Sequence, residues 1–543
     1  MDSVDLPFGD FSGQNSLFVD FVNQFSKVQN FYNPPPLEDS DIKKRIDKSR
    51  QSCQVPRSHF TSSLSAYNKN LHDSSLLNKH LEAFKSKDCV TVITGQQVGL
   101  FGGPSFTVFK AATAICLAAQ LRKKGINAVP IFWMASNDSD FEEIRNSHFV
   151  DSNNNLLSLR FPKDSKDLFQ MAGTVKLDAI GDCLDQLFTR VDSYPYAEPV
   201  LKRLSQAYIP SRSFREGFAS WISHLFRDYG LIVFDPLMDI HRSHLSHFYE
   251  IAITHRENLI ETLQKRNRQI SKAGYEPQVS VDTSESLLFL IDEYRRYKLI
   301  WEKGKYRAKG PKKLSFSTKD LLRLAGKEPE RMGFNVLLRP ILQDYFFPTA
   351  FYIGGPAEVA YFSQVNSIAD YWGVEPVILP RAGFTIVNRR SQRYLKQNHL
   401  QPVEILQKSN DALIKRVLQE TQQSETLEQI ESLEEKLRIS LKKLQKSTHS
   451  SDPTVSAMLD NTQDKMLYQL EKVKARFITN YRHRSPVLKK HIDYLLTHLK
   501  PLNNPQERVL NFNHFLLEQG PTFLHEIMEM IDPLRFSHKI LHT

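Results

Sequence analysis

A glycine-rich loop is the first part of this sequence that could do chemistry. The run TGQQVGLFGGPSFTVFK, residues 94–110, links a β-branched segment to one rich in alanine and leucine. Glycines let a backbone approach a ligand closely, and the first turn of a helix offers free N–H groups to an anion. The spacing matches neither common nucleotide-binding fingerprint, so a tight turn with a surface lysine is the alternative interpretation. The candidates here are Thr94, Gly95, Gln96, Gln97, Gly99, Gly102, Gly103, Thr107 and Lys110.

Two carboxylates follow the next strand-like run. Asp138 and Asp140 lie in WMASNDSDFEEI, residues 133–144. Ligands of open α/β sheets bind beyond the carboxyl ends of the strands, so acids at this point could hold Mg²⁺, bind an amine or act as a base. Capping of the next helix by either aspartate, with further acids in its first turn, is an equally good interpretation.

Charged residues also interrupt an apolar run, LLRPILQDYFFPTAFYIGGPAEVAY, residues 337–361. Arg339, Gln343 and Asp344 lie among large hydrophobic side chains, where a charge needs a partner. The glycine-proline turn of the first loop then recurs as Gly354, Gly355 and Pro356, which places Glu358 on the first turn of a helix. Arg381, after the next strand, could clamp a carboxylate. A structural pair of Arg339 with Asp344 explains the pattern about as well as a functional one.

Other reactive side chains carry less weight. His244 and His247 are three apart on an expected helix, but no third ligand lies near them in the sequence, so we predict no metal site. The four cysteines are widely spaced and form no C-x-x-C pair, which argues against a zinc-thiolate site and against a disulfide framework.

The elements that must position these candidates alternate between strand and helix. Strand-like runs occupy 89–95, 128–135 and 231–236, and further strand-like pieces cover 337–355 and 374–381. Helical patterns cover 104–125 and 357–373. This alternation predicts a parallel α/β sheet with right-handed crossovers. The more polar stretches 146–225 and 240–335 read as mostly helical insertions that would wall a pocket.

The C-terminal part has a different residue pattern. No glycine occurs between Phe384 and Gln519, and large apolar residues recur every three or four positions over 430–444 and 466–481. With a turn at 447–453, this predicts an antiparallel helical hairpin resembling a coiled coil. Residues 388–500 carry 21 Lys and Arg against 13 Asp and Glu, so most of the net charge of +10 lies there. A solvated helix surface is the main interpretation, and nucleic-acid binding is unlikely by comparison.

Length and composition narrow further the class of protein to which this chain could belong. A chain of 543 residues exceeds what one core usually holds, which predicts two to four structural units. With 41% hydrophobic and 24% charged residues, most of the chain is expected to be folded. No apolar run is long enough for a membrane span, and the N-terminus lacks the features of a secretory signal, so we expect a cytoplasmic protein.

We predict seven segments along the chain. They are 1–145 for N-terminal helices and the first half of the core, 146–225 for the first insertion, 226–240 for a core strand, 241–335 for the second insertion, 336–385 for the second half of the core, 386–502 for the hairpin and 503–543 for C-terminal helices packing on the core.

Several stretches together closely resemble the BshC family of bacillithiol biosynthesis. They are ITGQQVGLFGGPSFTVFK, FWMASNDSDFEEI, GYEPQV, NVLLRPILQDYFFPTAFYIGGPAEVAYF and VILPR, and the resemblance covers essentially the whole chain. It implies a Rossmann-like core similar to nucleotidyltransferases, two connecting insertions, a helical coiled-coil domain and a homodimer. It also implies an enzyme that joins the carboxyl of L-cysteine to the amine of glucosaminyl-malate, giving bacillithiol. ATP, with Mg²⁺, is the expected cofactor, because adenylation is the chemically natural way to activate a carboxylate.

The resemblance also assigns residues to the pocket. In the first loop it points to Gly95, Gln96, Gln97, Thr107 and Lys110, and in the second half to Arg339, Gln343, Asp344, Gly354, Gly355, Glu358 and Tyr361. We expect catalytic roles for Lys110, Asp138, Asp140 and Asp344, and binding roles for the others named, including Arg381.

One departure from the family pattern stands out. The family pattern is Glu-Asp-His-Asp where this chain has Asn137, Asp138, Ser139 and Asp140, so a histidine base is absent. A ligase or nucleotidyltransferase-like enzyme that uses ATP and a different amine acceptor is therefore one alternative. A coiled-coil interaction protein on an inactive fold is another.

Overall fold

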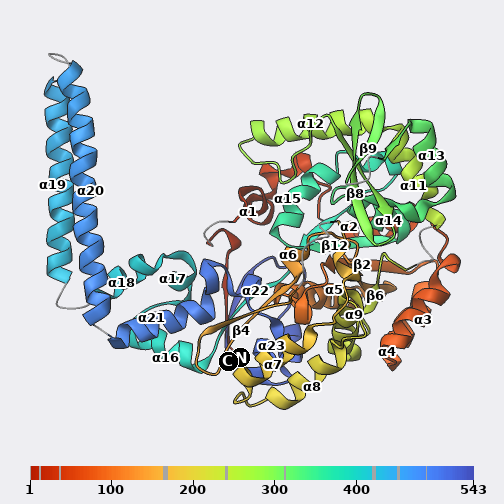
Figure 1. Ribbon diagram of the computed structural model, residues 1–543, viewed down its shortest axis with the longest axis horizontal. Helices are drawn as coiled ribbons and strands as arrows, with labels where there is room; N and C mark the ends of the chain where they lie inside the picture. Colours follow the sequence, from red (N-terminus) through yellow and green to blue (C-terminus); the bar gives the residue numbers. More distant parts are fainter. Residues whose placement is uncertain are drawn as a thin grey trace. The chain divides into compact units, whose positions relative to one another are not determined.

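The computed structural model describes residues 2–10, 14–35, 38–162, 169–238, 243–310, 314–418, 424–448, 453–484 and 486–543. The chain forms two compact units (Figure 1). The core unit contains Asp5–Phe384 and Glu507–Lys539, and the hairpin unit contains Met1–Val4, Thr385–Gln506 and Ile540–Thr543. No helix in the described ranges combines the length and the apolar character needed to cross a membrane.

A five-stranded parallel sheet lies at the centre of the core unit. Its strands are β2 (Val90–Gln96), β3 (Ala128–Met134), β6 (Ile232–Phe234), β12 (Thr349–Gly354) and β13 (Ile378–Pro380). They pair in the order β13-β12-β2-β3-β6, and every pair is parallel. This is the Rossmann-like order, and it reverses between β2 and β12. The predicted parallel α/β core is confirmed.

Helices cover both faces of this sheet, which explains why its strands are apolar almost throughout. On one face, Leu117 of α5 (Phe106–Lys123) and Ile46 of α2 (Asp39–Ser52) pack with Val92. On the other face, Leu81 of α4 (Ser75–Lys85) belongs to the same cluster as Ile93, together with residues of α1 (Ser16–Asn23) and α3 (Thr61–Leu71). The alternation of Val92 and Ile93 between the faces follows from the two-residue period of a strand.

The stretch 337–355 differs from the strand-like reading of its sequence. Leu338–Phe346 forms helix α14, and only the part from Thr349 onward is strand, β12. The Asn335 side chain accepts from the N–H groups of Leu337 and Leu338, at 3.1 Å each, before the helix. The helix stops at Phe346 because Phe347 precedes a proline and is extended. A short apolar run does not by its pattern distinguish a buried helix from a strand.

The first insertion combines a strand pair with helices. It contains β4 (Asn146–Val150), β5 (Leu156–Arg160), α7 (Ile180–Val191), α8 (Ala197–Ala207) and α9 (Phe214–Leu225).

The second insertion has helices α11 (Ser246–Thr254), α12 (Arg256–Lys272) and α13 (Thr318–Lys327). It also contains an antiparallel sheet that we did not predict, in the order β10-β9-β8-β7-β11. The strands are β7 (Glu285–Asp292), β8 (Arg295–Glu302), β9 (Lys305–Lys309), β10 (Ser315–Phe316) and β11 (Met332–Phe334). Exposed Lys and Arg alternate with buried residues in β9, so its polarity conceals a strand pattern.

The C-terminal part of the core unit returns to the sheet. Helices α23 (Phe512–Gln519) and α24 (Phe523–Glu529) lie beside α5, where the rings of Phe512 and Phe109 meet edge-on at 6.0 Å. A separate three-stranded sheet has the order β1 (Asp2–Leu6), β15 (His538–His542) and β14 (Gly383–Val387).

The predicted helical hairpin is confirmed in the hairpin unit. It consists of α19 (Ser424–Thr448) and α20 (Pro453–Arg484), which lie side by side (Figure 1). Lys474 of α20 pairs with Glu431 of α19 at 2.9 Å. Residues 449–452, most of the predicted turn, lie outside the described residues. The unit also contains α16 (Arg389–Gln397), α17 (Pro402–Gln407), α18 (Asn410–Leu418) and α21 (Pro486–Leu499).

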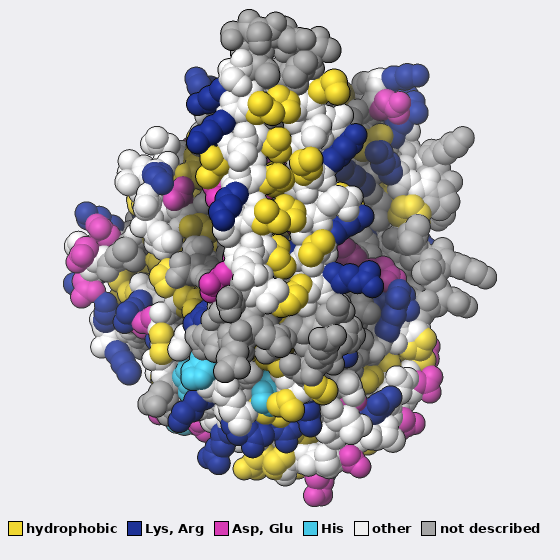
Figure 2. Space-filling view, turned by 90° about the vertical axis from the view of Figure 1, so that its left-hand side faces the viewer, with side chains coloured by type: hydrophobic (Ala, Val, Ile, Leu, Met, Phe, Trp, Pro, Cys, Tyr) yellow, Lys and Arg dark blue, Asp and Glu magenta, His cyan; other side chains and the backbone are white. Residues whose placement is uncertain are grey.

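An apolar stripe runs along one face of the hairpin. Figure 2 shows hydrophobic side chains aligned along it, with Lys and Arg on both sides. Leu433, Met466 and Val473 are about half exposed, at 52%, 45% and 55%. Exposed large hydrophobic residues in one contiguous patch are typical of an interaction surface.

Candidate active site

A cavity of about 510 Å³ lies at the carboxyl ends of β2, β3 and β12. The strand order of the sheet reverses between β2 and β12, which is where open α/β sheets bind ligands. The volume suits a small-molecule substrate. The cavity is lined by Gln96, Gln97, Phe106, Ala135, Asn137, Asp138, Glu143, Phe289, Arg296, Phe334, Asn335, Val336, Arg339, Gly355, Pro356, Ala357, Glu358, Tyr361, Arg381 and Arg508.

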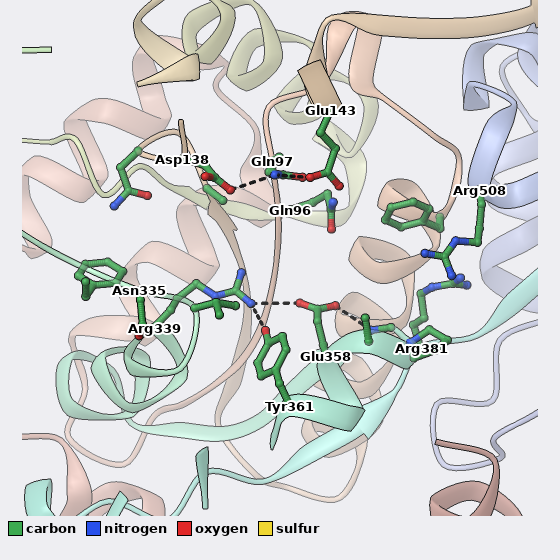
Figure 3. A pocket seen from close by; sticks show the side chains of 18 of the residues that line it. Gln96, Gln97, Asp138, Glu143, Asn335, Arg339, Glu358, Tyr361, Arg381 and Arg508 are labelled. Carbon is green, nitrogen blue, oxygen red and sulfur yellow. Dashed lines mark hydrogen bonds and ion pairs between the residues drawn. The ribbon is translucent and has the colours of Figure 1, made fainter. Parts of the chain in front are cut away.

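One side of the cavity, which we call the acidic wall, consists of Gln97, Asp138 and Glu143 (Figure 3). Gln97 Nε2 donates to Asp138 Oδ2 at 2.9 Å and to Glu143 Oε2 at 2.7 Å. Asp138 also lies 3.6 Å from Arg296 and accepts from the N–H of Ser139 at 2.7 Å. Among the residues that the structure describes, no cation lies within ion-pair distance of Glu143. In the acidic wall, Asp138 is therefore compensated by a cation and Glu143 is not.

Glu143 has the environment of a proton acceptor. Its side chain is exposed to the cavity, yet the surrounding protein removes enough water to raise its pKa. The hydrogen bond from Gln97 opposes that rise, and the charges of Asp140 and Asp138 add to it. A carboxylate with a raised pKa is suited to general-base catalysis. Sequence reasoning missed Glu143 because an acid just after Asp140 looked like an ordinary first-turn acid of a helix.

Opposite the acidic wall, Glu358 is the centre of a second group of side chains (Figure 3). Its Oε1 accepts from the Tyr352 hydroxyl at 2.6 Å and pairs with Arg339 at 3.3 Å. Its Oε2 pairs with Lys110 Nζ at 2.6 Å. Arg339 also donates to the Tyr361 hydroxyl. We call these five residues the Glu358 cluster.

The Glu358 cluster is held by helix α15 (Pro356–Val365) and by α5. The Gly355 N–H, just before α15, donates to Glu358 Oε2 at 2.8 Å. Burial alone would raise the pKa of Glu358, but Lys110 and then Arg339 bring it below its usual value. Burial lowers the pKa of Lys110 to about 8, against the pull of Glu358. Lys110 is fully buried behind Glu358, so it supports the cavity wall without lining it.

Two arginines, which we call the arginine pair, form the third side of the cavity. Arg381 follows β13 and binds buried Glu507 through two hydrogen bonds, Nη1 to Oε2 at 2.9 Å and Nη2 to Oε1 at 2.6 Å. Arg508 is the next residue after Glu507, in α22 (Gln506–Val509). The guanidinium groups of Arg381 and Arg508 lie next to each other at this edge of the cavity (Figure 3).

The glycine turn lies away from the cavity. A Cβ on Gly102 would lie 2.2 Å from the Trp221 ring, and one on Gly99 would lie 2.8 Å from Gly103 Cα. The N–H of Ser105, the residue before α5, is already used, because it donates to the Leu510 carbonyl at 2.8 Å. The turn is thus a tight connection from strand to helix, the alternative interpretation of its sequence.

Four other predicted residues of the two loops lie in the framework around the cavity. Thr94 Oγ1 donates to the Ile353 carbonyl at 2.9 Å, between β2 and β12. The Gly95 carbonyl accepts from Lys110. Thr107 is buried outside the cavity lining, and Gly354 is the last residue of β12.

Asp140, Gln343 and Asp344 also fall outside the cavity lining. Asp140 caps the short helix α6 (Phe141–Ile144), accepting from the Glu143 N–H at 3.1 Å. Gln343 and Asp344 are buried in α14, and Asp344 faces Arg45 of α2 at 3.6 Å. Burial raises the pKa of Asp344 to about 7. The side chains of Asp140 and Asp344, for which we predicted catalytic roles, thus make contacts outside the cavity lining.

The structure brings the remaining predicted residues together at the cavity. They are Gln96, Gln97, Asp138, Arg339, Gly355, Glu358, Tyr361 and Arg381. It adds Arg296 from β8 and Arg508, which no local sequence pattern indicates.

Comparisons with known proteins identify relatives over the whole length. Residues 4–382 match the family model described as "Bacillithiol biosynthesis BshC, N-terminal Rossmann-like domain", and residues 384–543 match that of the BshC "C-terminal coiled-coil domain". A protein of Salinibacter ruber is 26% identical, covering 97% of this chain and 96% of its own. One of Koribacter versatilis is 29% identical, covering 95% of each. Both are named "Putative cysteine ligase BshC". Among solved structures, the arginyl-tRNA synthetase of Thermus thermophilus is 10% identical. The match covers 80% of this chain and 86% of the synthetase chain, with a TM-score of 0.15.

Proposed function

The chain belongs to the BshC family of bacillithiol biosynthesis, and from this premise we propose that it is a ligase that joins the carboxyl group of L-cysteine to the amine of glucosaminyl-malate. The name of its relatives supports cysteine as the acyl donor. The observation that carries the proposal is the division of the cavity: a proton acceptor, Glu143, lies on one wall, and arginines that suit carboxylates lie on the others.

The proposed reaction forms one C–N bond. The amine nitrogen attacks the carbonyl carbon of an activated cysteine carboxyl, the bond from that carbon to the leaving group breaks, and the proton of the nitrogen passes to Glu143. ATP is the energy source that we propose, because an unactivated carboxylate and an amine do not condense readily in water. Asp138 presents the carboxylate oxygens that Mg²⁺ prefers, and the ion would offset phosphate charge.

In this proposal Glu143 is the base, since the histidine of the family pattern is absent at position 139. Ser139 does not line the cavity, whereas Glu143 does and has the raised pKa that a base requires. Gln97 fixes the orientation of the Glu143 carboxylate through its hydrogen bond at 2.7 Å. In this proposal the site has its base on helix α6, four residues after Ser139.

The test is mass spectrometry of the purified chain incubated with L-cysteine and glucosaminyl-malate, with and without ATP and Mg²⁺. We expect the amide product in the arm with ATP. Glu143→Gln should lower kcat by about 10²–10⁴-fold, the usual contribution of a positioned base. The matched control is Glu142→Gln, because Glu142 is adjacent but pairs with Arg145 and Arg160 outside the cavity, at 2.7 and 2.8 Å. If no arm gives product and the gene fails to restore bacillithiol in a strain that lacks this step, the proposal is wrong.

A ligase with another amine acceptor is the second candidate, and the serine at position 139 favours it. Under this alternative the chain would consume ATP and join cysteine to a different amine while leaving glucosaminyl-malate unchanged. The same assay with a panel of amines distinguishes the two.

A further inference from the structure

Arg508 is a cation in the cavity lining without a counter-ion. Within the described ranges, no carboxylate lies within ion-pair distance of Arg508. The carboxylates of Glu507 and Glu143 attract it from farther away. Glu507 is occupied by Arg381, which it holds through both carboxylate oxygens, and by the Phe384 N–H at 3.0 Å. The positive charge of Arg508 is therefore left over after the local ion pairs are formed.

The Arg508 side chain is exposed at the cavity edge, yet the surrounding protein and the charge of Arg381 both act on it. Burial, and then the charge of Arg381, lowers the pKa of Arg508, so the two guanidinium groups repel each other. Two arginines side by side at the edge of a cavity are the usual arrangement for a carboxylate or phosphate, which they bind through several N–H donors. An anion at this point would relieve the repulsion.

Arg381 also has a donor without a hydrogen-bond partner. Its side chain is only 4% exposed, and its Nε has no hydrogen-bond partner among the described residues. The Nε lies 3.8 Å from the place that a Cβ on Gly355 would occupy. Because residue 355 is glycine, no side chain at this position covers the Arg381 Nε.

We propose that Arg508 and Arg381 form an anion subsite that binds a carboxylate of the amine acceptor. The inference rests on the proposed function, in which the acceptor carries the two carboxylates of a malate group. Arg508 and Glu143 line the same cavity, so an acceptor bound by its acid arm at Arg508 would have its amine in the cavity that contains the base. Arg339 is less suited to this role, because Glu358 and Tyr361 already bind it.

Binding of L-malate to the purified chain, measured by calorimetry, tests the subsite without any turnover. We expect Arg508→Met to weaken malate binding at least tenfold, and Arg323→Met, which removes an exposed arginine that pairs with Asp320 at 3.5 Å, to leave it unchanged. Gly355→Ala should also weaken binding, because its methyl group would cover the Arg381 Nε at ordinary contact distances of 3.6 and 3.8 Å from its neighbours. Equal malate binding by wild type and Arg508→Met would overturn the subsite.

Kinetics then identify the source of the anion. A rise of at least tenfold in KM for glucosaminyl-malate, with KM for cysteine and ATP unchanged, is the expected result for Arg508→Met. The KM for glucosamine, an amine acceptor without a carboxylate, should change little in Arg508→Met. A rise confined to KM for ATP or for cysteine would assign the arginine pair to a phosphate or to the cysteine carboxylate, and would overturn the acceptor assignment.

The two proposals fail in different ways. If wild type forms no amide but binds malate through Arg508, the proposed function is wrong and the anion subsite stands. If wild type forms the amide and Arg508→Met has an unchanged KM for the acceptor, the function stands and the acceptor assignment is wrong.

Discussion

Gln97 connects both carboxylates of the acidic wall. Its hydrogen bond opposes the rise in the pKa of Glu143 that burial causes. We predict that Gln97→Ala raises the pKa of Glu143. Since the base must be ionised to accept a proton, the acidic limb of the kcat/KM profile should move to higher pH. Gln96→Ala, next to it on the same strand end, is the control and should leave that limb in place. An acidic limb that Gln97→Ala does not move would argue against Glu143 as the base.

Lys110 stabilises the fold through its ion pair with Glu358. Without Lys110 the Glu358 carboxylate keeps Arg339 but loses a charged hydrogen bond, so we predict that Lys110→Met lowers the free energy of unfolding by about 1.5–3 kcal/mol. Lys124→Met, which affects an exposed pair with Asp39, should cost about 1 kcal/mol or less. Urea denaturation measures both, and equal costs would show that the buried pair contributes no more than a surface one.

The same lysine predicts a pH dependence. Its pKa is about 8 in the folded state and 10.5 ordinarily, so between these values the unfolded chain binds more protons than the folded one. The contribution of Lys110 to the free energy of unfolding therefore increases from pH 8 to 10.5. Lys110→Met should lack this increase when the two proteins are compared by denaturation across that range. An identical slope in both proteins would contradict the lowered pKa.

Several predicted site residues that follow strands lie at the cavity, and their roles stay predictions. Gln97 and Arg381 come directly after β2 and β13, Asp138 comes four residues after β3, and the carboxyl ends of parallel strands meet at one edge. Arg296 and Arg508 escaped prediction because they come from an inserted antiparallel sheet and from a segment more than 100 residues beyond the last core strand. Only the tertiary fold brings them to the cavity.

At the scale of elements, the glycine turn between β2 and α5 shapes the backbone. Gly102 has a φ of +98°, and any side chain there would meet the Trp221 ring. We predict that Gly102→Ala lowers the melting temperature by several degrees because of both strain and overlap. Gly125→Ala is a control for the strain alone, since its φ is +77° and no atom lies within 4 Å of its Cβ position. Equal losses in the two variants would mean that the packing on Trp221 contributes nothing.

Most elements of the parallel core could be predicted, and the exceptions have a physical reason. Strands β2, β3 and β6 are buried β-branched or aromatic runs, which the sequence displays directly. Helix α14 is buried on nearly every side and only nine residues long, so its composition matches that of a buried strand. The resemblance assigns Asp344 to the pocket, and a structural pair with Arg339 is the alternative, whereas the structure places Asp344 against Arg45.

At the scale of the whole molecule, we propose that the apolar stripe of the hairpin contacts a second copy of the chain. A groove of about 480 Å³ between α19 and α20 is lined mainly by apolar atoms, with Leu433, Leu437, Met466 and Leu470 among its residues. The double change Leu433→Glu and Met466→Glu should shift the mass measured by light scattering from dimer to monomer. Lys465→Glu, at the same groove but outside the stripe, should keep the dimer. A monomeric wild type would contradict the proposal.

The strand order has a consequence for synthesis on the ribosome. β2 and β12 are neighbours in the sheet, but more than 250 residues separate them in the chain, and Arg508 follows later still. While the chain emerges, the edge of β2 that will pair with β12 has no partner, and such edges promote aggregation. A chain cut short before residue 508 lacks part of the cavity wall. Translation thus completes the binding site only after more than nine-tenths of the chain has been made, so that a prematurely terminated product would lack the arginine pair.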